Sequence, residues 1–532
     1  MTSPFLKKVE RMSSPFAYFA KLSDCGSKHL AMYLAIREAI GQGKLSPGEK
    51  LPSTRQLAAL YGLSRGSVSL AYEMLSAEGF VQAGVGQGTF VAGTEREETG
   101  TGPSPDGRES GGEAVSEPPR LTKWGLRLQE TQSAAPRSDG SEGHSDGDRP
   151  ADEADVVSFV PAGLGPDRFP WHEWKAEVAQ QWRSFGASGA ADGHGTEGSL
   201  ALRKAIAGRL RRERGIPCRE EDIVVTSGSM QAIALLSQLL LEEGKAAVVE
   251  NPGYVGTRNA VKATGAAIVA GRTDGGGIVP RDWDAELLFV TPTRQFPTGV
   301  VLSFERRLSL LAWASRRGAW IVEDDYDSDF RWGGRPIEPL KALDREGRVV
   351  YVGTFSRSMS ASMRIGFAVV PQELMQPFLL AKKLYDPYPT GIAEQQALAN
   401  WMSSGGYDRH MRKMRRVLGK LENKLRACLD ADLQGLFTAF PSDAGLHVYA
   451  RWEGTEEAYR RLLEACLRRG VEWKDGSAYD IPVGEKPPPS ALFGFSHLNE
   501  RQIEDGVRRI RQAALALGEL RASPEQGGNV HD

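Results

Sequence analysis

The sequence predicts an α/β protein in two folded parts: a small helical domain that ends in a β-hairpin, and a large domain built on a mostly parallel sheet. Three observations carry this prediction. The 532 residues exceed the size of one ordinary domain. Residues 26–93 contain three helical patterns before a Gly-rich hairpin. Residues 156–520 alternate short β-branched strands with helices, and a smaller α+β lobe is expected from about residue 400.

Charge is distributed unevenly along the chain, although the net charge is only -2. Residues 1–93 hold ten Lys and Arg against six Asp and Glu, whereas residues 94–155 hold seven against fifteen. A basic head followed by an acidic spacer favours contact of the head with nucleic acid. A surplus of this size can equally arise by chance, so charge alone does not decide the function.

The four cysteines lie far apart and form no metal-binding pair, which indicates free thiols in a reducing compartment. The chain contains no apolar run of about 18 residues, and its first residues lack the apolar core of a signal peptide. We therefore expect a cytoplasmic protein with no metal site and no membrane partner.

The small domain shows clear helix boundaries. Residues 29–42 place apolar side chains at helical spacing. Ser53 and Gln56 have the spacing of a capping box, and Gly62 ends the helix that they begin. Ser64 can cap a third helix, and a Gly-rich hairpin follows. This order is typical of a winged helix-turn-helix, which places the second helix of the pair in the major groove of DNA.

Residues at the start of that third helix are the candidates for contact with base edges. Arg55, at the start of the preceding helix, can reach phosphate with the help of helix N-terminal amides. The Gly-rich tip of the hairpin can approach the DNA backbone or the minor groove. The candidate DNA-binding residues are Arg55, Arg65, Gly66, Ser67, Ser69 and Gly86.

Residues 94–155 are rich in Gly, Ser, Pro, Asp and Glu and contain few large apolar residues. Such a segment cannot bury enough apolar surface to fold alone, so we expect a flexible acidic linker. One island interrupts it, LTKWGLRL at 121–128. Trp124 and Leu128 predict a short helix there that docks on another part of the molecule.

The large domain shows five short β-branched runs, at 223–227, 246–251, 286–292, 319–325 and 349–353. Helical patterns such as the one at 303–317 lie between them. Strands that alternate with helices favour a layered α/β structure with a mostly parallel sheet.

Several turns that follow these strands carry polar or aromatic side chains. Ser227, Gly228 and Ser229 follow a strand and precede a helix, so their amides and hydroxyls can hold an anion, although such a turn is more often a simple helix cap. Tyr254 lies in a turn that exposes an aromatic face for stacking. Asp324 ends a buried strand, and a buried carboxylate needs a cationic or protonated partner such as a pyridinium nitrogen.

These motifs carry a resemblance to a known family. Residues 29–92 are similar to the GntR-type winged helix, almost residue for residue. The large domain resembles the fold-type I aminotransferases, which are pyridoxal-phosphate-dependent transferases, and more specifically the MocR/GabR subgroup of GntR regulators. The motifs that carry this resemblance are VTSGSMQA (225–232), ENPGY (250–254), TPTRQFPTGVV (291–301), VEDDYDSDFRWGGRP (322–336) and GTFSRSMSASMRIG (353–366). One departure is that the wing lacks the basic residue that often precedes its GxGTF turn in the family.

The resemblance implies that the large domain binds pyridoxal 5'-phosphate. Asp324 would then pair with the pyridine nitrogen, Tyr326 would bond the ring hydroxyl, and Tyr254 would lie near the ring. The phosphate would be held by a set of small, hydroxyl and guanidinium residues. The cofactor-binding candidates are Ser227, Gly228, Ser229, Tyr254, Asp324, Tyr326, Ser356, Arg357 and Arg364.

One departure from the family decides the expected mechanism. The family's Schiff-base lysine falls at the residue after Ser356, where this chain has Arg357. A Schiff base needs a neutral amine, and a guanidinium stays protonated because its pKa lies above roughly 12. We therefore expect no catalytic residue, and a cofactor that is bound without a covalent link or is lost.

Three further departures agree with this expectation. Arg294 stands where family members usually have His, so two extra guanidiniums suggest a more cationic pocket. The stretch GHGT at 193–196 lacks the family's tyrosine, which reaches across a dimer. The strand near 491–496 lacks the arginine with which aminotransferases commonly hold a substrate carboxylate.

The sequence thus favours a DNA-binding regulator whose aminotransferase-like domain senses a small-molecule effector. Two alternatives stay open: a large domain that serves only as a dimerisation scaffold, and a working pyridoxal-phosphate-dependent aminotransferase. The resemblance also implies a homodimer, in which two winged helices would read two half-sites of a double-stranded operator.

Overall fold

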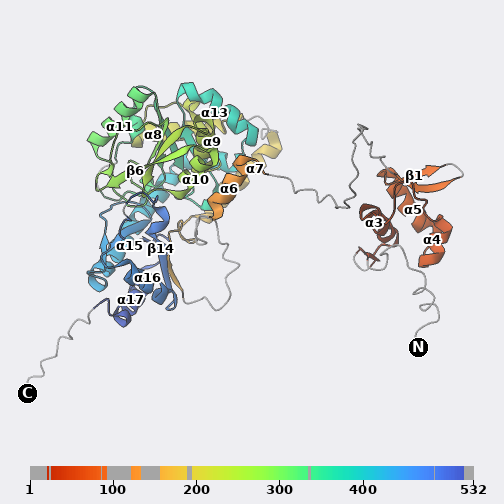
Figure 1. Cartoon of the computed structure of the whole chain (residues 1–532). Coiled ribbons are helices and arrows are strands. Elements are labelled where there is room, and N and C mark those ends of the chain that lie inside the picture. Colours follow the sequence, from red (N-terminus) through yellow and green to blue (C-terminus); the bar gives the residue numbers. More distant parts are fainter. Residues whose placement is uncertain are drawn as a thin grey trace, which may run out of the picture. The chain divides into compact units, whose positions relative to one another are not determined.

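The computed structural model describes residues 21–22, 25–84, 87–92, 121–133, 156–188, 195–333, 337–484 and 486–520. The chain divides into two compact units, Met1–Ser116 and Glu117–Asp532 (Figure 1). Each unit is described by itself.

In residues 28–91 of the first unit, three helices precede a β-hairpin, which confirms the predicted winged helix-turn-helix. Its elements are α3 (Lys28–Gly41), α4 (Thr54–Tyr61), α5 (Arg65–Ala77), β1 (Val81–Gly84) and β2 (Gly88–Val91). The predicted capping box is present, because the Ser53 side chain accepts from the Gln56 amide and the Gln56 side chain accepts from the Ser53 amide. Buried side chains from all three helices and both strands form one core, which includes Ile36, Leu57, Val68, Leu75, Val81 and Val91.

The second unit contains an eight-stranded sheet. Its strands are β4 (Ile223–Thr226), β5 (Ala246–Asn251), β6 (Ala267–Asp274), β7 (Gly277–Ile278), β8 (Leu287–Val290), β9 (Trp320–Asp325), β10 (Val349–Thr354) and β11 (Gly366–Val369). The spatial order is β4-β11-β10-β9-β8-β5-β6-β7. Five neighbouring strands, from β10 to β6, pair in parallel, while β11 and β7 run antiparallel to their neighbours. The five predicted strand runs coincide with β4, β5, β8, β9 and β10.

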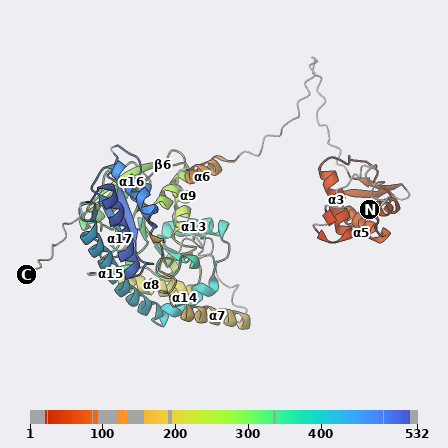
Figure 2. The same cartoon turned by 90° about the horizontal axis from the view of Figure 1, so that it is seen from below.

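Helices cover both faces of this sheet (Figures 1 and 2). Successive side chains of a strand point to opposite faces of the sheet, so each face has its own core. In β4, Val224 packs in one core cluster, while Ile223 and Val225 pack in another. The first face carries α9 (Ser229–Leu240), α10 (Val255–Thr264) and α13 (Gln372–Tyr385). The opposite face carries α8 (Leu200–Arg214) and α11 (Phe304–Arg317). Shorter or peripheral elements are α7 (Trp171–Ser188), α12 (Leu340–Leu343), α14 (Ile392–Ser403), η3 (Glu220–Asp222), η4 (Ser328–Phe330) and η5 (Ala361–Met363).

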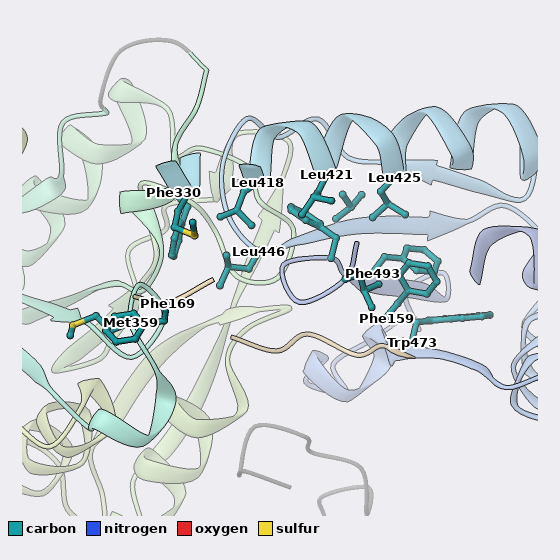
Figure 3. Packing of buried hydrophobic residues seen from close by; sticks show 14 of the residues in the cluster. Phe159, Phe169, Phe330, Met359, Leu418, Leu421, Leu425, Leu446, Trp473 and Phe493 are labelled. Atoms are coloured by element: carbon teal, nitrogen blue, oxygen red, sulfur yellow. The ribbon is translucent and has the colours of Figure 1, made fainter. Parts of the chain in front are cut away.

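The C-terminal lobe is an α+β layer around a five-stranded sheet. Its elements are α15 (Gly406–Asp432), β12 (Phe437–Ala439), β13 (His447–Trp452), α16 (Glu456–Leu467), β14 (Val471–Asp475), η6 (Gly476–Tyr479), β15 (Ser490–Gly494) and α17 (Glu500–Leu517). A strand from far upstream, β3 (Val157–Phe159), completes the sheet in parallel with β14, so the lobe also includes residues before 400. Figure 3 shows the core, in which leucines of α15 lie above Phe159, Trp473 and Phe493.

The linker island forms a helix, α6 (Lys123–Ser133), within the second unit. It packs against α10, and the Arg127 side chain pairs with Glu243 and bonds the Ala263 carbonyl. The rest of the linker lies outside the described residues.

Candidate functional site

The candidate ligand residues gather where the strands of the large sheet end. Ser227 and Tyr326 directly follow the carboxyl ends of β4 and β9. Ser356 lies two residues beyond the end of β10, and Arg294 four residues beyond the end of β8. The carboxyl ends of parallel strands lie at one edge of a sheet, and ligands of open α/β folds bind at that edge. Segments more than a hundred residues apart in the sequence therefore contribute to one site.

One side of this site has the form of an anion cradle. Gly228 has a φ of 90° and precedes the first turn of α9, which Ser229 opens. This φ favours glycine, and the absence of a side chain at Gly228 lets the Arg364 guanidinium approach its backbone closely. Arg364 Nη2 donates to the Ser227 carbonyl at 3.0 Å, and the Ser227 and Thr390 hydroxyls are 3.1 Å apart. Helix amides, hydroxyls and a guanidinium are the donors that a phosphate requires.

Ser356 supplies a further polar group. Its hydroxyl oxygen is buried and has no hydrogen-bond partner among the described residues. Its amide donates to Thr354 Oγ1 at 3.2 Å, so the backbone is fixed while the side chain is left for another partner. A buried hydroxyl without a partner is costly and is typical of a binding site.

Asp324 is a buried carboxylate at the end of β9. Its Oδ1 is buried and finds no hydrogen-bond partner among the described residues. Burial and the charge of Asp325 raise the pKa of Asp324, Arg357 lowers it, and the net result is a pKa of about 7. A carboxylate in this state is suited to a protonated ring nitrogen, because the new partner would satisfy both the charge and the hydrogen bond.

Arg294 lies in a buried ion pair. Its Nη1 donates to Asp327 Oδ2 at 3.0 Å and to the Tyr326 hydroxyl at 2.8 Å, and its Nη2 donates to the His447 carbonyl at 3.0 Å. The side chains of Arg294 and Asp327 are 3% and 1% exposed. The expectation that Arg294 makes the pocket more cationic is therefore not met, because Asp327 neutralises its charge.

The Arg294 bond also orients Tyr326. A guanidinium only donates, so the Tyr326 oxygen accepts and its own proton is directed elsewhere. Burial raises the pKa of Tyr326 above its usual range, which keeps that proton in place. Tyr326 is thus prepared to donate a hydrogen bond to an acceptor in the site.

Arg357 is half-buried and, in contrast to Arg294, has no ion pair within 4 Å among the described residues. It lines a cavity together with Arg209, Arg214 and the residues from Asp325 to Phe330. Its charge opposes the rise that burial causes in the pKa of Asp324 and of Asp327. Arg357 therefore acts electrostatically on both carboxylates without forming an ion pair with either.

A cluster of aromatic side chains lies beside Tyr326. Phe296 lies at the centre and makes edge contacts with Tyr254, Tyr326, His447 and Tyr479, at centroid distances of 5.0 to 5.8 Å. Sequence reasoning had selected only Tyr254 and Tyr326. Asp327 lies in the motif at 322–336, but the sequence did not reveal its ion pair with Arg294. The two residues are 33 positions apart, and no local pattern connects them.

In the first unit, Arg55, Arg65 and Gly66 are exposed, and Ser67 and Ser69 are half-buried at the start of α5. Ser64 caps that helix through the Ser67 amide. Gly86 lies outside the described residues. The hairpin also has a basic neighbour that we had not predicted: Lys50 pairs with Phe90, and its ammonium lies 5.8 Å from the Phe90 ring.

Two negative findings apply to the residues that the structure describes. None of their helices is long and apolar enough to cross a membrane. They also contain no group of three or more His, Cys, Asp or Glu side chains arranged for a metal ion. Residues 193 and 194 of the GHGT stretch fall outside the described part.

Comparison with known proteins gives two family matches. Residues 29–91 match the family of bacterial regulatory proteins named gntR, and residues 167–473 match aminotransferase class I and II. The second match covers more than half of the chain.

Individual proteins resemble the whole chain or its large unit. The "Probable rhizopine catabolism regulatory protein MocR" of Rhizobium meliloti is 32% identical over 93% of this chain and 95% of its own length. The pyridoxine biosynthesis transcriptional regulator PdxR of Corynebacterium glutamicum is 31% identical, with 91% and 95% covered. The crystal structure of LysN, an α-aminoadipate aminotransferase of Thermus thermophilus complexed with N-(5'-phosphopyridoxyl)-L-leucine, matches with a TM-score of 0.61 and 25% identity over 69% of this chain and 94% of that one.

Proposed function

The chain belongs to the gntR family of bacterial regulatory proteins and carries an aminotransferase class I and II domain, and from this premise we propose that it is a transcriptional regulator whose large domain binds pyridoxal 5'-phosphate as an effector and does not catalyse transamination. Of the relatives that match along most of their length, one is named a regulatory protein and another a transcriptional regulator. The observation that carries the non-catalytic part is Arg357, which follows Ser356 in the site.

The DNA-binding side of the proposal rests on the start of α5. Arg65 is the first residue of that helix and is exposed, while the helix behind it is anchored by Val68, Ala71, Tyr72 and Leu75. An exposed arginine at the N-terminus of a recognition helix can bond the edge of a guanine. A homodimer of large units would bring two such helices to the two half-sites of an operator.

The residues of the ligand site fit the cofactor that the fold family implies. The Asp324 Oδ1 and the Ser356 hydroxyl, both buried and without a hydrogen-bond partner among the described residues, are features that a phosphorylated pyridine explains. Asp324 would hold the ring nitrogen and Tyr326 the ring hydroxyl. Ser227, Gly228, Ser229, Ser356 and Arg364 would hold the phosphate, and Tyr254 would lie beside the ring.

When bound to an enzyme, this cofactor supplies an aldehyde and an electron-withdrawing ring for amino-acid chemistry. The aldehyde can be tethered only by a neutral amine. A guanidinium is not a neutral amine and cannot relay a proton as a lysine amine does. Arg357 instead brings to the site a positive charge that forms no ion pair within 4 Å with a described side chain, which suits the binding of an anionic ligand.

The test is a titration of the purified full-length chain with pyridoxal 5'-phosphate, followed by calorimetry, beside the Arg357→Lys variant. Both proteins should bind. After borohydride reduction, mass spectrometry should find a phosphopyridoxyl group on residue 357 of the variant only. An exposed substitution of the same type, Arg219→Lys, is the matched control and should behave as the wild type.

Two results would contradict the proposal. Binding to neither protein would mean that the large unit acts as a scaffold or takes another ligand. Turnover of an amino acid by the wild type, above a heat-killed control, would restore the aminotransferase alternative.

A further inference from the structure

The helix α6 lies at the far ends of two helices whose near ends line the ligand site. Helix α9 begins at Ser229 and α10 begins directly after Tyr254, both in the site. Their other ends lead to Glu243 and Ala263, which are the two partners of Arg127 on α6. At 1.5 Å per residue, the lengths of α9 and α10 separate these ends by about 15 to 18 Å.

A polar contact connects α6 to the ends of α9 and α10. Arg127 forms an ion pair with Glu243 and donates to the Ala263 carbonyl at 3.4 Å, next to the C-terminal end of α10. A cation is favoured at a helix C-terminus because the last carbonyls lack intrahelical partners. Gly265 allows this approach, since a Cβ there would lie 2.6 Å from the Arg127 guanidinium carbon. One side chain thus connects the far ends of both helices.

The described side chains of α6 are otherwise largely accessible to solvent. None of the described side chains from 121 to 131 is buried, and the four large apolar ones, Leu121, Trp124, Leu126 and Leu128, are 37 to 50% exposed. The helix has 11 residues, and isolated helices of that length are marginal in water. The ordering of α6 therefore depends on its docking, as expected for an element that can be released.

The near ends of α9 and α10 are, by contrast, closely packed. A Cβ at Gly256, in the first turn of α10, would lie 2.8 Å from the Met230 sulfur in the first turn of α9. Arg258 of α10 donates to the carbonyls of Asp480 and Ala478 in the C-terminal lobe. A ligand that bonds Ser229 and packs on Tyr254 would thus order both helices together.

We propose that α6 is a ligand-responsive latch: occupancy of the site strengthens the docking of α6 through Arg127, and docking shortens the tether of the DNA-binding unit. This inference rests on the proposed function, because it needs a ligand in the site. About 30 residues separate β2, which ends at Val91, from α6, which begins at Lys123, and about 64 separate β2 from β3, which begins at Val157. Between flexible chains of these two lengths, the effective concentration of the head would differ roughly threefold.

The test uses the full chain and hydrogen exchange of the amides in 123–133, with and without pyridoxal 5'-phosphate. The ligand should slow exchange of α6 in the wild type. Arg127→Ala should abolish this protection, and because coupling is reciprocal it should weaken pyridoxal 5'-phosphate binding about fivefold. Lys123→Ala is the matched control, because the Lys123 ammonium also lies 3.4 Å from Glu243. The Lys123 side chain is 79% exposed, so its removal should change the affinity for pyridoxal 5'-phosphate less than twofold.

Exchanging the two charges of the Arg127–Glu243 ion pair distinguishes the loss of that pair from a general folding defect. The double variant Arg127→Glu, Glu243→Arg should restore part of the protection that Arg127→Ala or Arg127→Glu removes. If Arg127→Ala releases α6 while ligand affinity stays unchanged, or if the ligand leaves exchange of α6 unaffected, the latch is wrong and the proposed function stands. If calorimetry shows that the wild type binds no pyridoxal 5'-phosphate, the proposed function fails and the latch fails with it.

Discussion

The candidate DNA-binding residues and the candidate ligand residues differ in their spread along the chain and in their exposure. Those of the first unit that are described fall between Arg55 and Ser69 and lie at or near the surface. The ligand residues extend from Ser227 to Arg364 and include the buried Asp324. The first surface depends on local helix starts, whereas the second depends on how distant strand ends meet.

The difference also concerns charge. Arg55 and Arg65 are exposed, and water solvates them until DNA replaces it. In the ligand site each charge acts on its neighbours at low dielectric, so Arg294 needs Asp327, and Asp324 without a hydrogen-bond partner shifts its pKa. A substitution in the ligand site should therefore affect stability, while one in the head should affect only binding.

The largest expected effect is on the buried ion pair. Asp327→Ala leaves Arg294 buried without its carboxylate and should lower the free energy of unfolding by about 3 to 5 kcal/mol. Chemical denaturation monitored by tryptophan fluorescence measures this. The control is Asp282→Ala, which breaks an ion pair with Arg317 whose carboxylate side chain is 64% exposed, and it should leave stability within error. An equal decrease in the free energy of unfolding for both variants would contradict the expectation that the buried ion pair contributes more to stability.

The next effect is on ligand affinity. Asp324→Asn removes the negative charge proposed to meet the ring nitrogen and should weaken pyridoxal 5'-phosphate binding by about 1.5 to 3 kcal/mol, the value of a hydrogen bond to a charged group. Calorimetry measures the affinity, and operator binding without ligand should not change. An unchanged ligand affinity would remove Asp324 from the site.

Asp324 also predicts a pH dependence. Its pKa is raised from 3.8 to about 7 by burial, so the folded protein keeps a proton that the unfolded chain releases near pH 4. The ligand-free protein should therefore lose stability as the pH rises from about 4 through 7. The Asp324→Asn variant has no titrating group at this position, so its stability should fall less over the same pH range. Thermal melting of both proteins across this range checks the difference, and parallel curves would contradict it.

A smaller effect is expected at the head. Arg65→Ala should weaken specific DNA binding by about 1 to 3 kcal/mol and relax the choice of base at one position, without an effect on stability or on ligand binding. Competition of operator variants in a mobility-shift assay measures both quantities. Unchanged operator affinity would remove Arg65 from base recognition.

The smallest effect concerns the hairpin. If Lys50 contacts one phosphate, Lys50→Ala should reduce the slope of log K against log salt by about 0.9 and weaken all DNA sequences equally. Glu49→Gln at the neighbouring exposed position offers a control that keeps the lysine. A loss confined to one operator sequence would contradict a phosphate contact.

The sequence by itself determined those features that local physical chemistry controls. The Ser53 capping box, the left-handed Gly62 and the cap at Ser64 set the helices of the head, because each acts within four residues. The β-branched runs marked the five strands whose ends carry the site. The motif around Ser356 located Arg357, the residue on which the proposed non-catalytic role rests.

Only the tertiary structure decided how charges are paired. Arg294 and Arg357 looked equivalent in the sequence, yet Asp327 neutralises the first and no described side chain pairs with the second. Lys50 pairs with Phe90 of the hairpin, and β3 pairs with β14 of the C-terminal lobe. Arg127 contacts Glu243 and Ala263, which lie more than a hundred positions away. These partners are distant in the sequence, and the energy of a buried or bridging charge depends on which groups surround it in space.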